Sequence, residues 1–114
     1  MEEDFSTLTA KVRRLVREGR YLISTHALKD HPERGIAADH ILECLKLGSV
    51  AAVESREVEG KIRYEGSRRY RWFGEDHRDR VLRLILVIRT DVVVISAAEA
   101  TEGQAERYRR EDKT

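Results

Sequence analysis

The sequence predicts an α+β fold in which N-terminal helices pack on an antiparallel sheet of four to five strands and another helix ends the chain. Apolar residues recur at helical spacing in the first 48 positions. From Val50 onward they alternate with a period of two, as in strands. A polar helical pattern returns after position 100. Helices followed by a block of strands are typical of α+β domains, because the helices cover the sheet from one side.

Two amphipathic helices are expected in the first half of the chain. Ser6 or Thr7 caps the first helix, whose last residue is Glu18 and which Gly19 terminates. The second covers 37–47, where apolar residues repeat at helical spacing and a glycine follows. Between the two helices we expect a short β-prone segment and a helical turn that a proline interrupts, over 20–24 and 25–34 respectively.

The second half of the chain predicts a sheet and a closing helix. Strands are expected near 50–56, 61–65, 68–73, 81–89 and 92–97. The last two are almost continuously apolar, as in strands that are covered on both faces, whereas the earlier ones alternate with charged residues. Thr101 caps the final helix, which runs to Arg110 and turns Ala105 and Tyr108 inward.

The composition indicates one soluble domain over residues 1–114. The single cysteine cannot form an intramolecular disulfide, and the sequence has neither a signal peptide nor a long apolar run. We therefore expect a cytoplasmic protein that does not associate with membranes. The net charge of +1 conceals a basic middle, because residues 61–89 carry nine positive and four negative side chains. Such a local excess attracts a polyanion even when the whole chain is nearly neutral.

Basic and aromatic side chains alternate within this basic segment. Arg69 and Arg71 are expected on one face of their strand, with Arg68, Tyr70 and Trp72 on the other. Lys61 and Arg63 alternate with Ile62 and Tyr64 in the same way. A guanidinium binds phosphate oxygens, and an aromatic ring stacks on an unpaired base for about 1 to 3 kcal/mol. The pattern favours single-stranded RNA as the ligand; a solvated face balanced by nearby carboxylates and an acidic protein partner are the alternatives.

The histidines suggest a proton carrier more readily than a metal site. His26, His31, His40 and Cys44 have ligand chemistry, but their spacing on different elements does not match that of zinc sites. No metal or cofactor is therefore expected, and Cys44 is interpreted as a small core residue. His26 follows Ser24 and Thr25 at a strand-to-helix junction, where it either transfers a proton or bonds to the local backbone.

Short motifs resemble two groups of bacterial proteins. The segments 23–28 and 33–36, followed by a helix and a strand, resemble a family of unknown function with an "HA…ERGI" pattern, which is grouped with the RelE/ParE-like toxins. The C-terminal half resembles BrnT-type toxins of the same superfamily through Gly60, Arg63-Tyr64, Gly66, the apolar strand to Arg89, 94–97 and 106–108. The matches cover about residues 21–110 and leave 1–20 as an additional helix.

The resemblance implies a RelE-like fold with a curved antiparallel sheet and a metal-independent endoribonuclease that cleaves mRNA, free or on the ribosome. It also implies an antitoxin that covers the open sheet face. In this chemistry the ribose 2′-OH attacks the adjacent phosphate. We expect Arg63, Arg69 and Arg71 to bind the phosphate, and His26 or Tyr64 to transfer the proton. Further contacts to the RNA are expected from Lys61, Arg68, Tyr70 and Trp72, and either Tyr70 or Trp72 is expected to stack on a base.

Two positions depart from the patterns of these families. Ala98 stands where BrnT-type toxins have an arginine, and Asp30 stands where the "HA" family commonly has one. The departures are consistent with a weakened nuclease or with a different substrate. The alternative function is a catalytically inactive module of the same fold that binds RNA or a protein; a structural or oligomeric domain that uses 81–95 as an interface is a third hypothesis.

Overall fold

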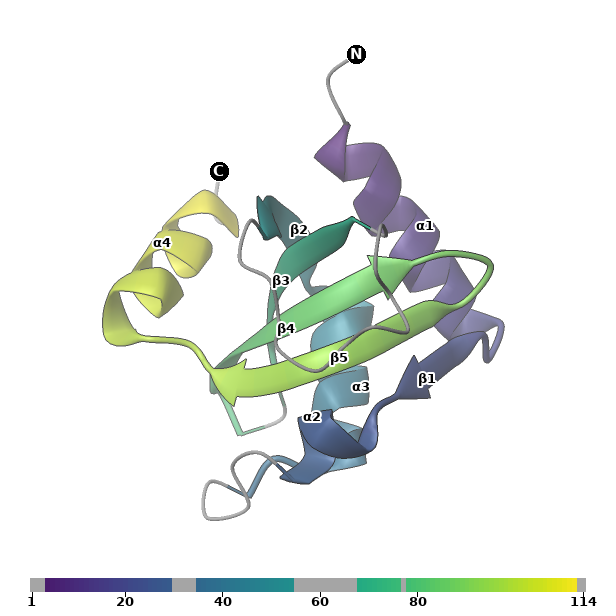
Figure 1. Ribbon diagram of the computed structural model, residues 1–114. Coiled ribbons are helices and arrows are strands. Elements are labelled where there is room, and N and C mark those ends of the chain that lie inside the picture. The colour runs from purple at the N-terminus through teal and green to yellow at the C-terminus, as the bar shows by residue number, and fades with distance from the viewer. Residues whose placement is uncertain (1–3, 30–34, 55–67, 77, 113–114) are drawn as a thin grey trace.

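The structure is a computed structural model that describes residues 4–29, 35–54, 68–76 and 78–112. It is an α+β arrangement of four helices and a five-stranded mixed sheet that does not close on itself (Figure 1). No helix in these ranges is long and apolar enough to cross a membrane. The elements are α1 (Phe5–Arg17), β1 (Tyr21–Ile23), α2 (Thr25–Lys29), α3 (Ala38–Leu47), β2 (Ser49–Glu54), β3 (Arg69–Glu75), β4 (Val81–Ile88), β5 (Val92–Glu99) and α4 (Glu102–Asp112).

The strand order in the sheet is β1-β5-β4-β3-β2, which corrects the prediction of a purely antiparallel sheet. Neighbours from β2 to β5 are antiparallel, but β1 lies parallel to β5, with Tyr21 opposite Val92. The segment expected to be β-prone therefore forms an edge strand. The long connection through α2, α3 and three strands allows this parallel pairing, which a tight hairpin could not provide. The strand expected at 61–65 lies outside the described residues.

The two long N-terminal helices form where the apolar periodicity predicts them. The cap of α1 is Asp4 instead of Ser6 or Thr7, because its Oδ1 accepts hydrogen bonds from the backbone N–H groups of both residues, at 3.0 and 3.3 Å. A carboxylate at this position also interacts favourably with the positive end of the helix dipole. α1 ends before Gly19, whose φ of 78° is accessible to glycine at little cost.

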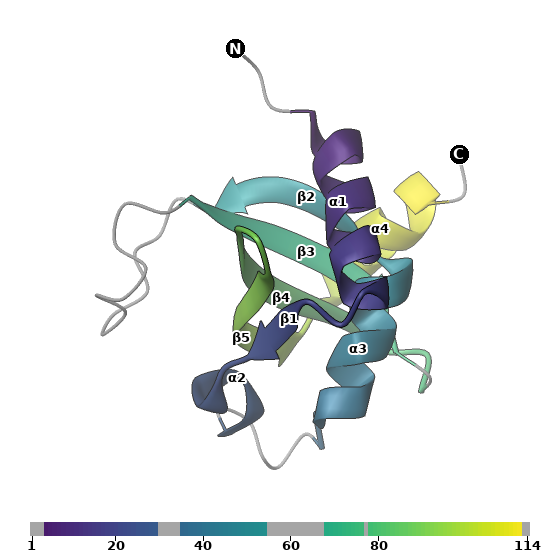
Figure 2. The ribbon, with the colours of Figure 1, turned by 90° about the vertical axis from the view of Figure 1, so that its right-hand side faces the viewer.

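The main core lies between the sheet and the two helices α1 and α3, which cover the same face of it (Figure 2). We call this covered side the inner face and the opposite side the outer face. Trp72, Leu84 and Val94 from three neighbouring strands are fully buried on the inner face. They pack in one cluster with buried residues of the helices: Val12, Leu15, Val16, Ile41, Cys44 and Leu45.

The C-terminal end of α3 approaches β3 so closely that two glycines are required. A Cβ on Gly74 would meet the carbonyl oxygen and the sulfur of Cys44 and the Cα of Gly48. A Cβ on Gly48 would meet the Phe73 carbonyl oxygen and the indole nitrogen of Trp72. This approach allows Trp72 Nε1 to donate a 2.9 Å hydrogen bond to the Cys44 carbonyl oxygen. The indole is therefore fixed inside the core.

α4 stands beside the β2–β3 end of the sheet (Figure 1). Thr101 caps it as expected, since Gln104 N–H donates to Thr101 Oγ1 at 3.2 Å and Thr101 N–H donates to Gln104 Oε1 at 3.0 Å. Tyr108 is buried against Phe73 and Val81 in a small cluster separate from the main core, with Ala105 packed against it. The predicted inward side of this helix is thus confirmed.

A candidate nucleic-acid interface

Of the nine side chains expected to carry function, the structure describes six, and these six lie at four different places. Lys61, Arg63 and Tyr64 lie outside the described residues. Tyr70 and Trp72 belong to the inner face, and Arg69 and Arg71 to the outer face. Arg68 is exposed immediately before β3, and His26 is exposed on α2.

The two aromatic rings of β3 are not available for stacking on a base. Trp72 is 0% exposed and Tyr70 is 6% exposed, and both belong to the main core. The expectation that Tyr70 or Trp72 stacks on RNA is therefore wrong for this conformation. The alternation along the strand was read correctly, but α1 and α3 cover the face that carries the rings, because that face offers the larger apolar surface.

Arg69 and Arg71 share the outer face of β3, as their spacing predicts. Arg71 is paired with Glu54 of β2, whose Oε2 accepts hydrogen bonds from Arg71 Nε at 3.3 Å and from Nη2 at 3.0 Å. The Glu54 side chain is only 9% exposed, so this ion pair is better shielded than a surface pair. The pair fixes the orientation of the Arg71 guanidinium. In the parts of the chain that the structure describes, its third nitrogen, Nη1, has no hydrogen-bond partner.

A cleft of about 560 Å³ lies between the outer face of β2–β3 and α4. Arg71 lines it from the sheet, and Arg107 lines it from the helix. Its polar groups also include Thr101 and Gln104, together with Ser49. Two guanidinium groups therefore reach one hollow from elements that are more than thirty positions apart in the sequence. Their electric fields add in the cleft, where water screens them less than on an open surface.

Three charged residues of this region were missed by sequence reasoning. Arg107 is exposed on α4 and Arg83 lies on β4 opposite Phe73, and neither has an ion-pair partner within the described ranges. Glu54 is the partner of Arg71. The signal for Arg83 was its isolation in the apolar run 81–88. Arg107 stands in the motif 106–108 and Glu54 in the expected strand 50–56, but no local pattern places either residue next to Arg71, since only the packing of α4 and the register of β2 bring them there.

His26 is placed far from this cleft in the sheet order. Ser24 fixes the start of α2 at the β1–β5 edge, because its N–H donates to the Val94 carbonyl oxygen and its Oγ to the Ile95 carbonyl oxygen, each at 2.9 Å. The cleft lies at the opposite edge, beside β2 and β3. The structure therefore does not bring His26 together with Arg71 at the cleft, and its role as a proton carrier stays a prediction.

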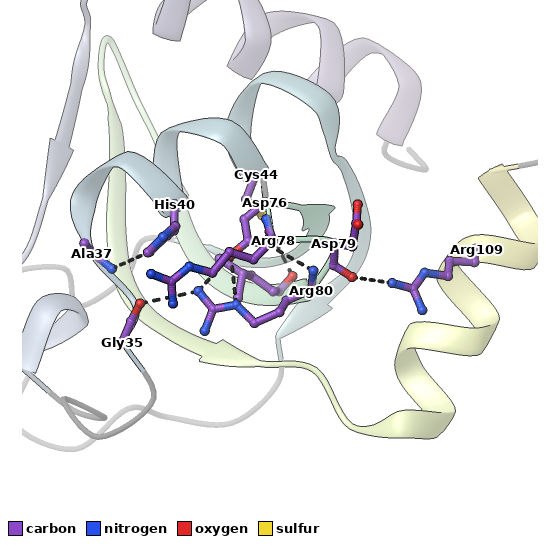
Figure 3. Close-up of polar contacts among 10 residues, drawn as sticks. Gly35, Ala37, His40, Cys44, Asp76, Arg78, Asp79, Arg80 and Arg109 are labelled. Carbon is purple, nitrogen blue, oxygen red and sulfur yellow. Dashed lines mark hydrogen bonds and ion pairs between the residues drawn. The ribbon is translucent and has the colours of Figure 1, made fainter.

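A buried carboxylate organises the β3–β4 turn beside the cleft (Figure 3). Asp76 Oδ1 accepts hydrogen bonds from the N–H groups of Arg78 and Arg80, each at 3.0 Å, and Oδ2 accepts one from Arg80 Nε at 2.9 Å. Burial tends to raise the pKa of Asp76, but these hydrogen bonds and the charge of Arg80 outweigh it, so the pKa lies below its ordinary value.

The same turn anchors α4. Arg109 Nη2 donates a 2.6 Å hydrogen bond to the Asp79 carbonyl oxygen, a contact visible in Figure 3, and Arg109 Nε pairs with Glu75 at 3.1 Å. Asp79 has a φ of 60°, which the aspartate tolerates within this tight loop. The turn therefore sets the position of the helix that brings Arg107 to the cleft.

His40 and Cys44 both lie in the interior near this turn. His40 Nδ1 accepts a 2.9 Å hydrogen bond from the Ala37 N–H at the start of α3, and Cys44 is completely buried. Among the described residues, no group of three or more His, Cys, Asp or Glu side chains is placed to hold a metal ion.

The Cys44 thiol is expected to be unreactive in the folded protein. Burial raises its pKa well above the ordinary value, and the negative charge of Asp76 raises it further. A thiol-specific colorimetric reagent should react with Cys44 at least about a hundredfold more slowly in native buffer than in concentrated urea, because the thiolate is the reacting form. Rapid stoichiometric reaction in native buffer would show that the thiol is accessible.

No family model matches the chain, and neither the curated proteins nor the solved structures contain a match. The features that bear on function are those of the chain itself: an α+β fold whose outer face carries arginines from β3 and β4 and a cleft lined by Arg71 and Arg107.

Proposed function

We propose that this protein binds RNA, without cleaving it, in the cleft between β2–β3 and α4. The observation that supports the proposal most strongly is that Arg71 and Arg107 line the same cleft from two different elements. A planar guanidinium donates two parallel hydrogen bonds to phosphate oxygens, so two of them form a site for a phosphate backbone. The motif resemblance to RNA-cleaving toxins favours RNA over other polyanions.

The outer face favours phosphate binding beyond this single pair. Arg69 and Arg83 add positive charge on β3 and β4, and the cleft wall also carries the amide of Gln104 in α4 and the hydroxyl of Thr101, which caps that helix. Glu54 orients Arg71 and leaves Nη1 for a ligand. Backbone contacts of this kind position a nucleic acid without reading its sequence. We therefore expect binding that is strongly salt-dependent and weakly sequence-specific.

Cleavage of RNA at the same site is the second candidate. It is favoured by Tyr108 and Glu111, which line the cleft with the two arginines and belong to residue types that can carry a proton. We rank it below simple binding because His26 lies at the other edge of the sheet and the Tyr108 hydroxyl is directed to the Leu47 carbonyl oxygen, 3.5 Å away. The roles of Arg63 and Tyr64 in such a reaction stay predictions.

Loss of either cleft arginine should weaken RNA binding. Arg71→Gln and Arg107→Gln are each expected to raise the Kd for a fluorescein-labelled twelve-nucleotide oligouridylate by about ten- to thirtyfold in fluorescence anisotropy, because each removes a charge-assisted contact to phosphate. Glu54→Gln removes a negative charge beside Arg71 but keeps an oxygen that can accept its hydrogen bonds, and should lower the Kd by about three- to tenfold. Arg17→Gln, an exposed change on α1, is the matched control.

The same RNA separates the two candidate functions. Incubated with the protein in EDTA and analysed on a denaturing gel, it should remain intact under the binding hypothesis. Cleavage that the Arg71→Gln variant abolishes would establish the endoribonuclease instead. Equal affinity of the wild type, the two cleft variants and the Arg17→Gln control would refute RNA binding in this cleft, and binding of an acidic protein alone would identify a different kind of partner.

A further inference from the structure

The guanidinium of Arg69 contains a donor that the fold leaves unused. Its Nε is buried and has no hydrogen-bond partner in the described part of the chain. Glu54 lies directly opposite Arg69 in the β2–β3 register, yet its Oε2 bonds to Arg71. A buried donor without an acceptor is costly to a fold. Nε itself is out of reach of solvent, but Arg69 as a whole is partly exposed, so a ligand's acceptor would contact the guanidinium at its terminal nitrogens.

Arg69 continues the row of positive charge that begins in the cleft. Arg69 and Arg71 are two positions apart on the same face of β3, so their Cα atoms are about 6.6 Å apart. Arg71 faces Arg107 across the cleft, whereas Arg69 lies beyond the cleft lining along the strand. The carboxylate of Glu54 is held at Arg71 on the side of the neighbouring strand β2. A phosphate backbone that follows the row from Arg71 to Arg69 therefore meets two separate cationic positions.

We propose that the ligand is a single RNA strand that runs along β3 with one phosphate at Arg71 and Arg107 and the next phosphate at Arg69. This inference rests on the proposed function and names the form of RNA that the site takes. A single strand can bend into a cleft with walls on both sides and adjust the spacing of its phosphates. The phosphates of a duplex lie on a rigid convex surface, which does not fit such a hollow.

The phosphate count of short ligands tests the inference. Wild-type protein should bind UpUpU, which has two phosphates, about tenfold more tightly than UpU, which has one, in NMR titrations. Arg69→Gln should bind both with the affinity that the wild type has for UpU. Arg69→Lys keeps the charge without the planar fork and should restore part of the preference. With a twelve-nucleotide strand, Arg69→Gln should also reduce the steepness of the logarithmic salt dependence by about 0.7.

The outcomes distinguish this inference from the proposed function. A preference for UpUpU that persists in Arg69→Gln would overturn the second phosphate position while leaving RNA binding intact. Equal affinity for a duplex and for a single strand of the same length would overturn the choice of a single strand. Failure of the wild type to bind any RNA would refute the proposed function, and this inference with it. Arg17→Gln should keep the wild-type preference, which shows that the effect belongs to Arg69.

Discussion

Replacing Gly74 by alanine is expected to lower the free energy of unfolding by about 3 kcal/mol. The new methyl group would meet the carbonyl oxygen of Cys44 and would lie 2.9 Å from the Cα of Gly48 and 3.0 Å from the Cys44 sulfur. Two of these three atoms are backbone, so α3 must move away from β3 to accept the substitution. Overpacking usually destabilises a protein by about 1 to 3 kcal/mol, and the upper end of this range is expected where no side-chain rotation can relieve the contact.

Urea unfolding monitored by circular dichroism measures this effect. Gly103→Ala is the matched control, because a Cβ at Gly103 meets nothing within 4 Å and the residue lies in α4. This change should leave stability unchanged or raise it by about 0.5 to 1 kcal/mol, as expected for glycine in a helix. If Gly74→Ala proves as stable as Gly103→Ala, the close approach of α3 and β3 is not a property of the folded protein.

Removing the buried carboxylate of Asp76 is expected to have an effect of similar or larger size. Asp76→Ala leaves the Arg80 guanidinium, whose side chain is 16% exposed, without its 2.8 Å partner and leaves two N–H groups of the turn without an acceptor. Breaking a buried ion pair in this way costs about 3 to 5 kcal/mol. Asp76→Asn retains an oxygen acceptor and should therefore lower stability less than Asp76→Ala does. Thermal unfolding should rank the wild type as the most stable, Asp76→Asn next and Asp76→Ala last.

The pH dependence of stability should show that the negative charge of Asp76 stabilises the fold. Because its pKa in the folded protein is lowered from 3.8, ionised Asp76 stabilises the fold fully above that pH. The contribution is lost as the pH falls from 3.8 through the lowered pKa. The difference in stability between the wild type and Asp76→Asn should therefore shrink in this acidic window. A difference that is constant from pH 6 to pH 2 would contradict the assignment.

The fold class could be predicted from the sequence because the spacing of apolar residues reflects which side chains of each helix or strand are buried. The change of period at Val50, the glycine after 37–47 and the Thr101 cap each correspond to a real boundary. The parallel pairing of β1 could not be predicted, since three residues do not encode a partner and the pairing depends on the packing of α2 at the β5 edge. The cap of α1 was misplaced because three polar residues of similar capping tendency stand close together.

The candidate site was predicted only in part. Spacing alone places Arg69 and Arg71 on one face, but it does not tell which face the helices cover, so Trp72 was expected at the surface. Arg107 could not be connected to Arg71, because their meeting depends on Tyr108 packing against Phe73. Long-range contacts of this kind leave no local pattern in the sequence.

Mapping the surface that contacts RNA tests the central claim most directly. In a titration of nitrogen-15-labelled protein with the twelve-nucleotide oligouridylate, backbone amide signals should shift most at Ser49, Arg71, Gln104 and Arg107, which line the cleft from β2, β3 and α4. Signals from Leu22 in β1, at the opposite edge of the sheet, should stay in place. Shifts concentrated in β1 and α2, or no shifts with saturating RNA, would contradict the assignment of this cleft as the RNA-binding site.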